Sequence, residues 1–298
     1  MALLAWFVLA PPALAARVAV VLSEDSAAYQ EAYQAIRAEL EANQHEAHPV
    51  YADGLSAPMI AGAQLVLTVG VRAAEAVATL PMRTAVLAAL VPRQWYLKTG
   101  KALLSEGGRR ELSAVFVDQP FERQATLIRL AFPEVRRVGV LVSAEQAAIL
   151  PELEAAMQSN RLSLMSAVLP SEGRVLPAAE AMLPTVDILL AVADPMVFNR
   201  STAQSLFLTS YRYRTPVLGY SRSMTRAGAL LSLYSSPAQI GQQAAEIAVT
   251  ALHGGVLRLP APAHPAYFSL SVNEKVGRSL GVPLAPEAEL AARMGVRP

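Results

Sequence analysis

The fold is decided by two apolar stretches near the middle of the chain, Arg137-Val138-Gly139-Val140-Leu141-Val142-Ser143 and Val186-Asp187-Ile188-Leu189-Leu190-Ala191-Val192-Ala193-Asp194. Each predicts a short buried strand that ends in a small or polar residue, and the segment between them has helical spacing. Similar strand and helix units precede and follow these two. Strands joined by helical crossovers pair in parallel with a right-handed connection, and parallel sheets bind ligands at the carboxyl ends of their strands.

Length and composition limit the class of protein. The 298 residues are enough for two domains, each with its own core. With 53% hydrophobic and 16% charged residues, the chain has a globular rather than a disordered composition. The net charge of +1 and the lack of long Lys/Arg runs argue against nucleic-acid binding. The chain has no Cys, which excludes disulfides and thiol chemistry.

The amino terminus has the features of a secretory signal. Residues 2–9 form an apolar run that is too short to span a bilayer, and Pro11-Pro12 and the A-x-A pattern Ala13-Leu14-Ala15 follow it. We expect a signal peptide over residues 1–16, cleaved after Ala15 or Ala16, and therefore a periplasmic protein with no membrane span after cleavage. No Lys or Arg precedes the run, so the true start codon stays open. No Cys follows the cleavage site to carry a lipid anchor.

Strand and helix patterns alternate along the whole chain. The first half predicts strands at 17–22, 47–51, 64–70, 84–91 and 112–117, with helices at 27–43 and 71–79. The second half predicts strands at 137–142, 163–168, 186–192, 216–220 and 229–233, with helices at 120–132, 150–160, 174–183 and 199–213. A long helix at 237–252 ends at Gly254-Gly255, and a Pro-rich connection then leads to a strand at 266–270 and a helix at 273–280. The pattern predicts an α/β fold with two Rossmann-like lobes of similar size.

Four segments carry a family resemblance through their order and spacing: residues 121–141, 186–190, 215–245 and 271–283. They include Phe132-Pro133-Glu134-Val135 before a strand, Thr215-Pro216-Val217-Leu218-Gly219-Tyr220, and Ser279-Leu280-Gly281-Val282-Pro283. Together they resemble the periplasmic substrate-binding proteins of ABC transporters, in particular the subfamily that includes binders of aromatic amino acids. The resemblance covers residues 119–283 and is weaker in the first lobe.

The resemblance implies the type I periplasmic-binding-protein fold, in which two hinge-linked lobes close on a ligand. Lobe 1 is expected at residues 17–117 plus 237–258, and lobe 2 at residues 118–234 plus 266–298. The hinge crossings are expected near 117–120, 234–236 and 259–265. The implied protein is a monomer that binds a small molecule, with an amino acid or a related metabolite as the candidate class, and delivers it to an inner-membrane ABC permease.

Candidate ligand contacts follow the strands directly, and they are Ser23, Glu24, Thr68, Gly70, Arg93, Ser143, Asp194, Tyr220 and Tyr234. Helix amino termini near Ser26 and Val71 offer backbone N–H groups that suit a carboxylate, and Asp194 suits an ammonium group. The family's pattern is incomplete here, because Val192-Ala193-Asp194-Pro195 retains only part of its second-lobe loop. In the first lobe, relatives carry a loop of small residues with a Thr-Asp-Pro pattern, and this chain has the different sequence of residues 90–96 at that position. The ligand is therefore not fixed by the sequence.

A structural role stays open beside the ligand role for most of these residues. Asp194 precedes Pro195 and is suited to capping, as are Ser23 and Ser143. Tyr220 and Tyr234 fit a core aromatic with a hydrated hydroxyl group. Arg93, close to Trp95-Tyr96, fits a surface cation–π cluster.

Signatures of enzymes are absent from the sequence. The four histidines, His45, His48, His253 and His264, have no metal-binding spacing. There is no G-x-S-x-G elbow, no P-loop, and no G-x-G-x-x-G after the first strand. We therefore expect binding without catalysis, with no cofactor and no metal. Two alternatives stay open: a periplasmic sensor that presents its state to a histidine kinase or another receptor, and an envelope enzyme that uses the same cleft.

Overall fold

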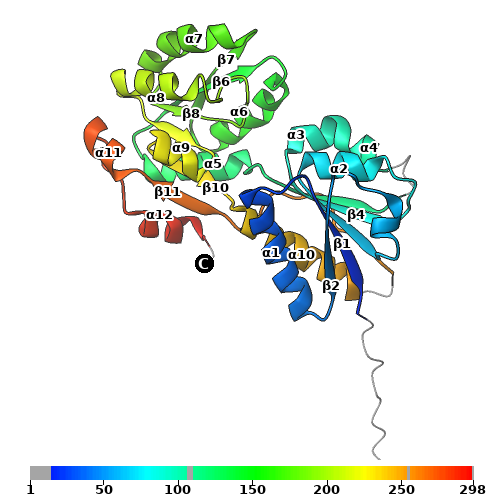
Figure 1. Ribbon diagram of the computed structural model, residues 1–298. Helices are drawn as coiled ribbons and strands as arrows, with labels where there is room; N and C mark the ends of the chain where they lie inside the picture. The colour runs from blue at the N-terminus through cyan, green and yellow to red at the C-terminus, as the bar shows by residue number, and fades with distance from the viewer. Residues whose placement is uncertain (1–14, 106–109, 254–255, 297–298) are drawn as a thin grey trace, which may run out of the picture. The chain divides into compact units, whose positions relative to one another are not determined.

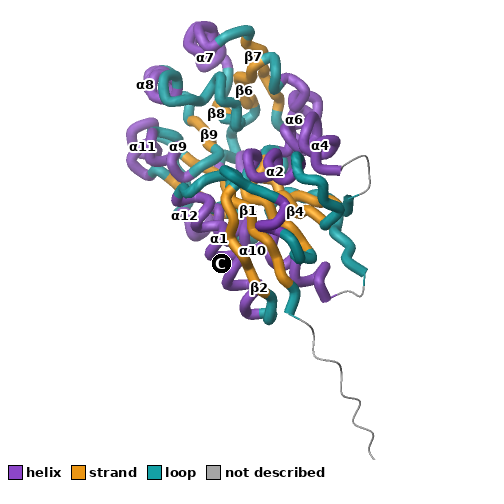
Figure 2. Tube along the Cα trace, turned by 45° about the vertical axis from the view of Figure 1, so that its right-hand side comes forward, coloured by secondary structure: helices purple, strands orange, loops and turns teal. Residues whose placement is uncertain are grey.

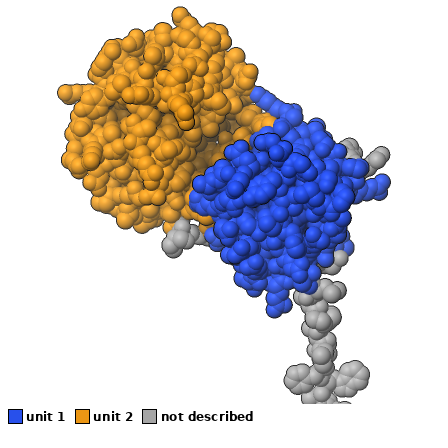
Figure 3. Space-filling model, viewed as in Figure 1, with its two compact units in different colours: residues 1–91, 98–114, 241–262 blue, residues 92–97, 115–240, 263–298 orange. Residues whose placement is uncertain are grey.

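The structure is a computed structural model that describes residues 15–105, 110–253 and 256–296. The signal peptide predicted for residues 1–16 lies outside the described residues except for Ala15 and Ala16, and so does the helix end predicted at Gly254-Gly255. The chain forms two compact units (Figure 3). Unit 1 consists of Met1–Val91, Lys98–Ala114 and Gly241–Pro262, and unit 2 consists of Pro92–Leu97, Val115–Ile240 and Ala263–Pro298.

Unit 1 is built on a five-stranded sheet with the order β2-β1-β3-β4-β5. The strands are β1 (Arg17–Leu22), β2 (Glu46–Tyr51), β3 (Leu65–Val69), β4 (Ala85–Val91) and β5 (Leu112–Phe116). The pairs β1–β2, β1–β3 and β3–β4 are parallel, as the alternation of strand and helix predicts. Residues 18–22 of β1 are all buried, because helices cover both faces of a parallel sheet.

The helices of unit 1 begin with α1 (Ala27–Ala42) and α2 (Val71–Ala78), and α10 (Pro237–His253) joins them late in the chain. Helix α1 buries Ala32, Tyr33, Ile36 and Leu40, which are spaced as one helical face. Helix α10 lies beside α1 (Figure 1), and a Cβ atom at Gly241 would come within 2.5 Å of the carbonyl oxygen of Ala32. The glycine therefore permits this close approach of the two helices.

Unit 2 contains a six-stranded sheet with the order β11-β10-β9-β8-β6-β7. Its strands are β6 (Arg137–Ser143), β7 (Ser163–Leu169), β8 (Ile188–Leu190), β9 (Val217–Gly219), β10 (Leu231–Tyr234) and β11 (Ser269–Val272). Its α-helices are α5 (Phe121–Ala131), α6 (Leu150–Ser159), α7 (Val175–Met182), α8 (Ala203–Arg212), α9 (Arg222–Ala227), α11 (Glu274–Leu280) and α12 (Glu287–Met294). The pairs among β6 to β10 are parallel.

The core of unit 2 has two layers, one on each face of this sheet. Val138 and Val140 of β6 pack with buried residues of α5 and α6, whereas Leu141 packs with α7 and α8. This division follows from the alternation of side chains along a strand. Helices α7 and α8 lie side by side in both ribbon and tube views (Figures 1 and 2).

Short helical elements complete the chain: η1 (Ala57–Ile60), α3 (Arg93–Trp95), the π-helical turn η2 (Tyr96–Gly100), α4 (Lys101–Ser105), η3 (Ala147–Ile149), η4 (Glu172–Arg174) and η5 (Leu183–Thr185). The run from Arg93 to Ser105, α9 and α12 are helical segments that the sequence pattern does not predict.

The two α/β units with mostly parallel sheets confirm the predicted fold class. One strand departs from it, because β11 pairs antiparallel with β10 and begins at Ser269 rather than at residue 266. The chain reaches β11 from α10 through a long connection rather than a βα crossover, so the right-handed parallel rule does not constrain its direction. Among the described residues, no helix is both long enough and apolar enough to cross a membrane.

Candidate functional site

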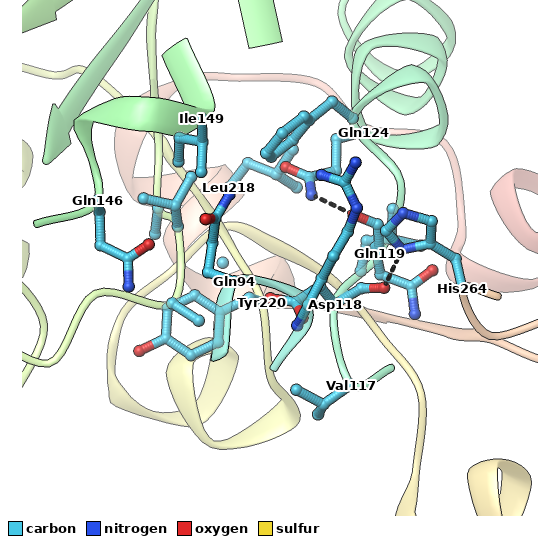
Figure 4. A pocket seen from close by; sticks show the side chains of 17 residues that line it. Gln94, Val117, Asp118, Gln119, Gln124, Gln146, Ile149, Leu218, Tyr220 and His264 are labelled. Carbon is cyan, nitrogen blue, oxygen red and sulfur yellow. Dashed lines mark hydrogen bonds between the residues drawn. The ribbon is translucent and has the colours of Figure 1, made fainter. Parts of the chain in front are cut away.

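The candidate site is a pocket of about 100 Å³ that belongs entirely to unit 2 (Figure 4). It is lined by Arg93, Gln94, Val117, Asp118, Gln119, Phe121, Gln124, Gln146, Ile149, Ala191, Val192, Ala193, Leu218, Gly219, Tyr220, Leu233 and His264. Residues 191–193 follow β8 and Tyr220 follows β9, while Gln146 and Ile149 come from the turn after β6. The pocket therefore opens at the carboxyl ends of parallel strands, where α/β sheets bind ligands.

Apolar side chains form much of the wall, among them Phe121, Ile149, Leu218 and Leu233. The ring of Tyr220 meets that of Phe198 edge to face, with centroids 6.3 Å apart. Burial raises the pKa of the Tyr220 hydroxyl, and the charge of Asp194 raises it further, so Tyr220 presents a neutral phenol. A ring or an aliphatic chain fits such a wall.

The polar wall comes from segments far apart in the sequence. Asp118 follows β5, and its Oδ2 accepts a 2.6 Å hydrogen bond from the backbone N–H of Arg93. The carbonyl oxygen of Asp118 lies 2.8 Å from Nδ1 of His264. Because a carbonyl oxygen can only accept, Nδ1 of His264 carries a proton. Burial raises the pKa of the Asp118 carboxyl, opposed by the Arg93 N–H and by His264.

Arg93, the arginine of the lining, is already paired. Its NH1 lies 2.7 Å from Oε2 of Glu152 on α6, and its side chain is 27% exposed. The pair has no net charge, so Arg93 does not present an uncompensated cation to the pocket.

A hydrogen-bond network behind the pocket joins three segments of unit 2. NH1 of Arg123 donates to Oε1 of Gln119 at 2.6 Å and to the carbonyl oxygen of Pro265 at 2.9 Å. Nε2 of Gln119 donates to Oγ of Ser235 at 2.7 Å. The guanidinium of Arg123 also lies 4.2 Å from the ring centroid of Phe268. Burial lowers the pKa of Arg123, which nevertheless stays protonated.

Four of the five predicted residues of the first half belong to unit 1 and do not line this pocket; Arg93 is the exception. Oγ of Ser23 donates to the carbonyl oxygen of Val69 and accepts from the backbone N–H of Ala73, so Ser23 holds the start of α2 against β1. Gly70 directly precedes α2 as its N-cap residue and has a φ of 91°. Thr68 is fully buried and its Oγ1 has no hydrogen-bond partner among the described residues. Glu24 is exposed.

In the second half, Ser143 and Asp194 bind each other rather than lining the pocket. Oδ2 of Asp194 accepts from the backbone N–H of Ser143 at 2.6 Å, and Oδ1 accepts from that of Met196 at 3.0 Å. Tyr234 is half-buried and does not line the pocket either. Of the predicted ligand residues, the pocket brings together Arg93 and Tyr220.

Sequence reasoning missed several polar residues of the pocket, namely Asp118, Gln119, Gln124, Gln146 and His264. Asp118 and Gln119 directly follow the predicted strand at 112–117, which is the signal that could have found them, but the sequence predicts a hinge crossing near 117–120 at this point. His264 lies in the Pro-rich connection, where no pattern marks it. Within the described part of the chain, no group of three or more His, Cys, Asp or Glu could hold a metal ion.

The family described as ABC transporter substrate binding protein matches residues 112–292, more than half of the chain. No curated protein sequence matches. Among solved structures with a similar fold is a conserved domain protein from Vibrio cholerae, with 21% sequence identity over 93% of this chain and 98% of that one and a TM-score of 0.62. An ABC domain in complex with L-Trp from Streptococcus pneumoniae has 17% identity over 90% of this chain and 96% of that one, with a TM-score of 0.59. A ligand-free, open substrate binding protein with adhesive properties from Clostridium difficile has 15% identity over 92% of this chain and 97% of that one, with a TM-score of 0.74. The extent of the family match shows that this chain belongs to the ABC transporter substrate-binding proteins.

Proposed function

We propose that this protein captures a small solute in the pocket of unit 2 and delivers it to an ABC permease of the inner membrane, after export to the periplasm. The observation that carries the proposal is the pocket itself, where Tyr220 and the segment 191–193 meet at the carboxyl ends of β9 and β8. Its apolar wall and amide side chains suit an amphipathic solute. The similar structure from Streptococcus pneumoniae is a complex with L-Trp, which supports a ligand of this size.

We extend the proposal to a hinge between two lobes, with the lobe boundaries given above. The chain passes between its compact units at 114/115, 240/241 and 262/263, close to the three predicted crossings. The short segment Pro92–Leu97 also belongs to unit 2, although β4, which directly precedes it, belongs to unit 1. If the lobes close on a ligand, small-angle X-ray scattering will show a smaller radius of gyration with ligand than without it.

Binding is tested by a thermal-shift screen of the full mature chain against amino acids, amines, sugars and other metabolites, followed by calorimetry of each hit. A ligand at about 100 times its Kd adds roughly 2.7 kcal/mol to stability, because it binds only the folded state. We expect Tyr220→Ala to weaken a hit at least ten-fold. Tyr211→Ala is the matched control, since Tyr211 is 51% exposed and does not line the pocket.

A library without any hit would contradict the binding function. A hit that binds Tyr220→Ala and wild type equally would place its site elsewhere. Delivery to a permease is tested separately, by measuring uptake of the labelled hit in cells with and without this gene. Uptake that does not depend on the gene would contradict the transport role while leaving the binding role intact.

A further inference from the structure

One side of the pocket in unit 2 carries a buried acceptor without a donor. Nε2 of Gln124 donates to the carbonyl oxygen of Gln119 at 3.1 Å. Only the amide nitrogen can donate to a carbonyl, so this bond fixes the orientation of the amide group. Oε1 of Gln124 is then buried and has no hydrogen-bond partner among the described residues. Buried acceptors nearly always have a hydrogen-bond donor in folded proteins, so we expect a ligand or a water molecule to donate to this atom.

The same side of the pocket carries the carboxylate of Asp118, which forms no ion pair within the described part of the chain, although the nearby charges of His264 and Arg93 partly offset the effect of its burial on the pKa. A backbone N–H, that of Arg93, reaches Oδ2 of Asp118. No side chain of the described residues forms an ion pair with this carboxylate or donates a hydrogen bond to it. Figure 4 shows Asp118, Gln119, Gln124 and His264 on one side of the cavity, with Gln146 and Ile149 across from them.

The arginines near the pocket are already engaged. Arg93 is paired with Glu152 at 2.7 Å, and Arg123 is bound to Gln119 and Pro265. The sequence suggests the carboxylate of Asp194 as the partner of an ammonium group, but each of its two oxygens already accepts a hydrogen bond from a backbone N–H group. The polar wall thus has a surplus of acceptors and negative charge, supplied by Asp118 and Gln124.

We propose that this pocket selects a small organic amine, whose ammonium group binds Asp118 and Gln124 while its apolar body lies against Ile149, Leu218 and Tyr220. The proposal rests on the solute-binding function proposed above and names the chemical class of its ligand. A carboxylate placed at the same wall would meet Asp118 and find no uncompensated arginine. A neutral hydroxyl group could donate one hydrogen bond but would leave the charge of Asp118 unpaired.

The test uses three probes with the same phenylethyl body and different polar groups: phenethylamine, 2-phenylethanol and 3-phenylpropionate. Calorimetry on the full mature chain at pH 7 should give the order amine, alcohol, acid, with the amine at least ten-fold tighter than the alcohol. The common body cancels the contribution of the apolar wall, so the ratios report the polar wall alone.

Two substitutions make the prediction specific. Asp118→Asn keeps an acceptor for the Arg93 N–H and should reduce the amine-to-alcohol ratio at least ten-fold. Glu152→Gln removes the partner of Arg93 and should improve binding of the acid. Glu154→Gln is the matched control: it removes the same charge from α6 at an exposed position where the carboxylate contacts Gln158, and it should leave all three affinities unchanged.

The inference is overturned if the acid binds as tightly as the amine, or if Asp118→Asn leaves the ratio unchanged. It also falls if the metabolite screen yields only ligands without an amine group, an outcome that leaves the solute-binding function standing. If neither the screen nor the probes give any binding, both proposals fail.

Discussion

The backbone N–H of Ser143 donates a 2.6 Å hydrogen bond to Oδ2 of Asp194, which joins the end of β6 to the segment after β8. The other carboxylate oxygen accepts from the backbone N–H of Met196, and Asp194 is only 2% exposed. Both oxygens thus hold the backbone in place next to the pocket. This arrangement favours a structural role for Asp194 over direct contact with a ligand.

Asp194→Ala should therefore destabilise the protein by roughly 2–4 kcal/mol, because the buried N–H of Ser143 and the partly buried N–H of Met196 lose their acceptor. Asp194→Asn keeps one acceptor oxygen and should cost less. Urea unfolding followed by circular dichroism measures both. If Asp194→Ala leaves the unfolding midpoint unchanged but weakens a ligand more than ten-fold, Asp194 is a ligand contact after all.

Gly70 and Ser23 give a second prediction, on unit 1. A Cβ atom at Gly70 would lie 2.5 Å from Oγ of Ser23, and the φ of 91° is unfavourable for any other residue. We expect Gly70→Ala to destabilise by roughly 1–3 kcal/mol through this strain, and Ser23→Ala by about 1 kcal/mol through loss of the two hydrogen bonds of its hydroxyl group. Gly173→Ala is the control, because its Cβ would meet no atom within 4 Å and its φ is not positive. A neutral Gly70→Ala would contradict the strain argument.

Arg123 should be important for stability through the segments that it joins. Arg123→Ala removes two hydrogen bonds and the stacking on Phe268, which predicts a loss of roughly 2–4 kcal/mol in unfolding free energy. Arg123→Lys keeps the charge but cannot reproduce the geometry of the guanidinium, so it should recover only part of this loss. Arg214→Ala, at an exposed position, should change stability by less than about 0.5 kcal/mol. Equal effects of Arg123→Ala and Arg214→Ala would refute the role of the network.

Asp187 predicts a dependence of stability on pH. Burial alone would raise the pKa of this carboxyl, but hydrogen bonds from the Arg137 side chain and from the backbone N–H groups of Arg136 and Arg137 outweigh it and lower the pKa. A depressed pKa in the folded state contributes stability that is present above the unfolded pKa of about 3.9 and is lost as pH falls through the folded value. The difference in unfolding free energy between wild type and Asp187→Asn should therefore be constant from pH 7 to about 5 and shrink below about pH 4. A difference that does not vary with pH would contradict this assignment.

Much of the fold follows from local pattern, and the exceptions have physical causes. Strand β1 occupies the predicted residues 17–22, because an uninterrupted apolar run between a polar start and a Ser-Glu-Asp-Ser turn allows few other structures. Strand β8 covers Ile188–Leu190, which is shorter at both ends than the predicted residues 186–192. The sequence pattern does not predict the helical run that begins at Arg93, because Pro92 and Gly100 are typical of loops.

The candidate site is less accessible to sequence reasoning. Tyr220 could be predicted because it directly follows an apolar strand, and the strand-end rule is local. The contact between Asp118 and His264 joins positions 146 residues apart, and no spacing in the sequence signals such a pair. The same holds for Arg93 and Glu152, which are 59 residues apart and whose pairing determines whether Arg93 is available to an anion.

Ala16 gives the last prediction, on the amino terminus expected after signal-peptide cleavage. Its carbonyl oxygen accepts from the backbone N–H of Glu46 at 2.9 Å, its N–H lies 3.3 Å from Nδ1 of His45, and the residue is 2% exposed. A chain that begins at Ala16 should be more stable than one that begins at Arg17 by roughly 1–3 kcal/mol, because the shorter chain leaves the Glu46 N–H without this acceptor. Urea unfolding of the two purified chains measures the difference. Cleavage of a signal peptide after Ala15 would retain Ala16 and its bond to β2, whereas cleavage after Ala16 would remove it. Mass spectrometry of the exported protein distinguishes the two cleavage sites. Equal stability of the two purified chains would mean that the stability of the fold does not favour cleavage after Ala15.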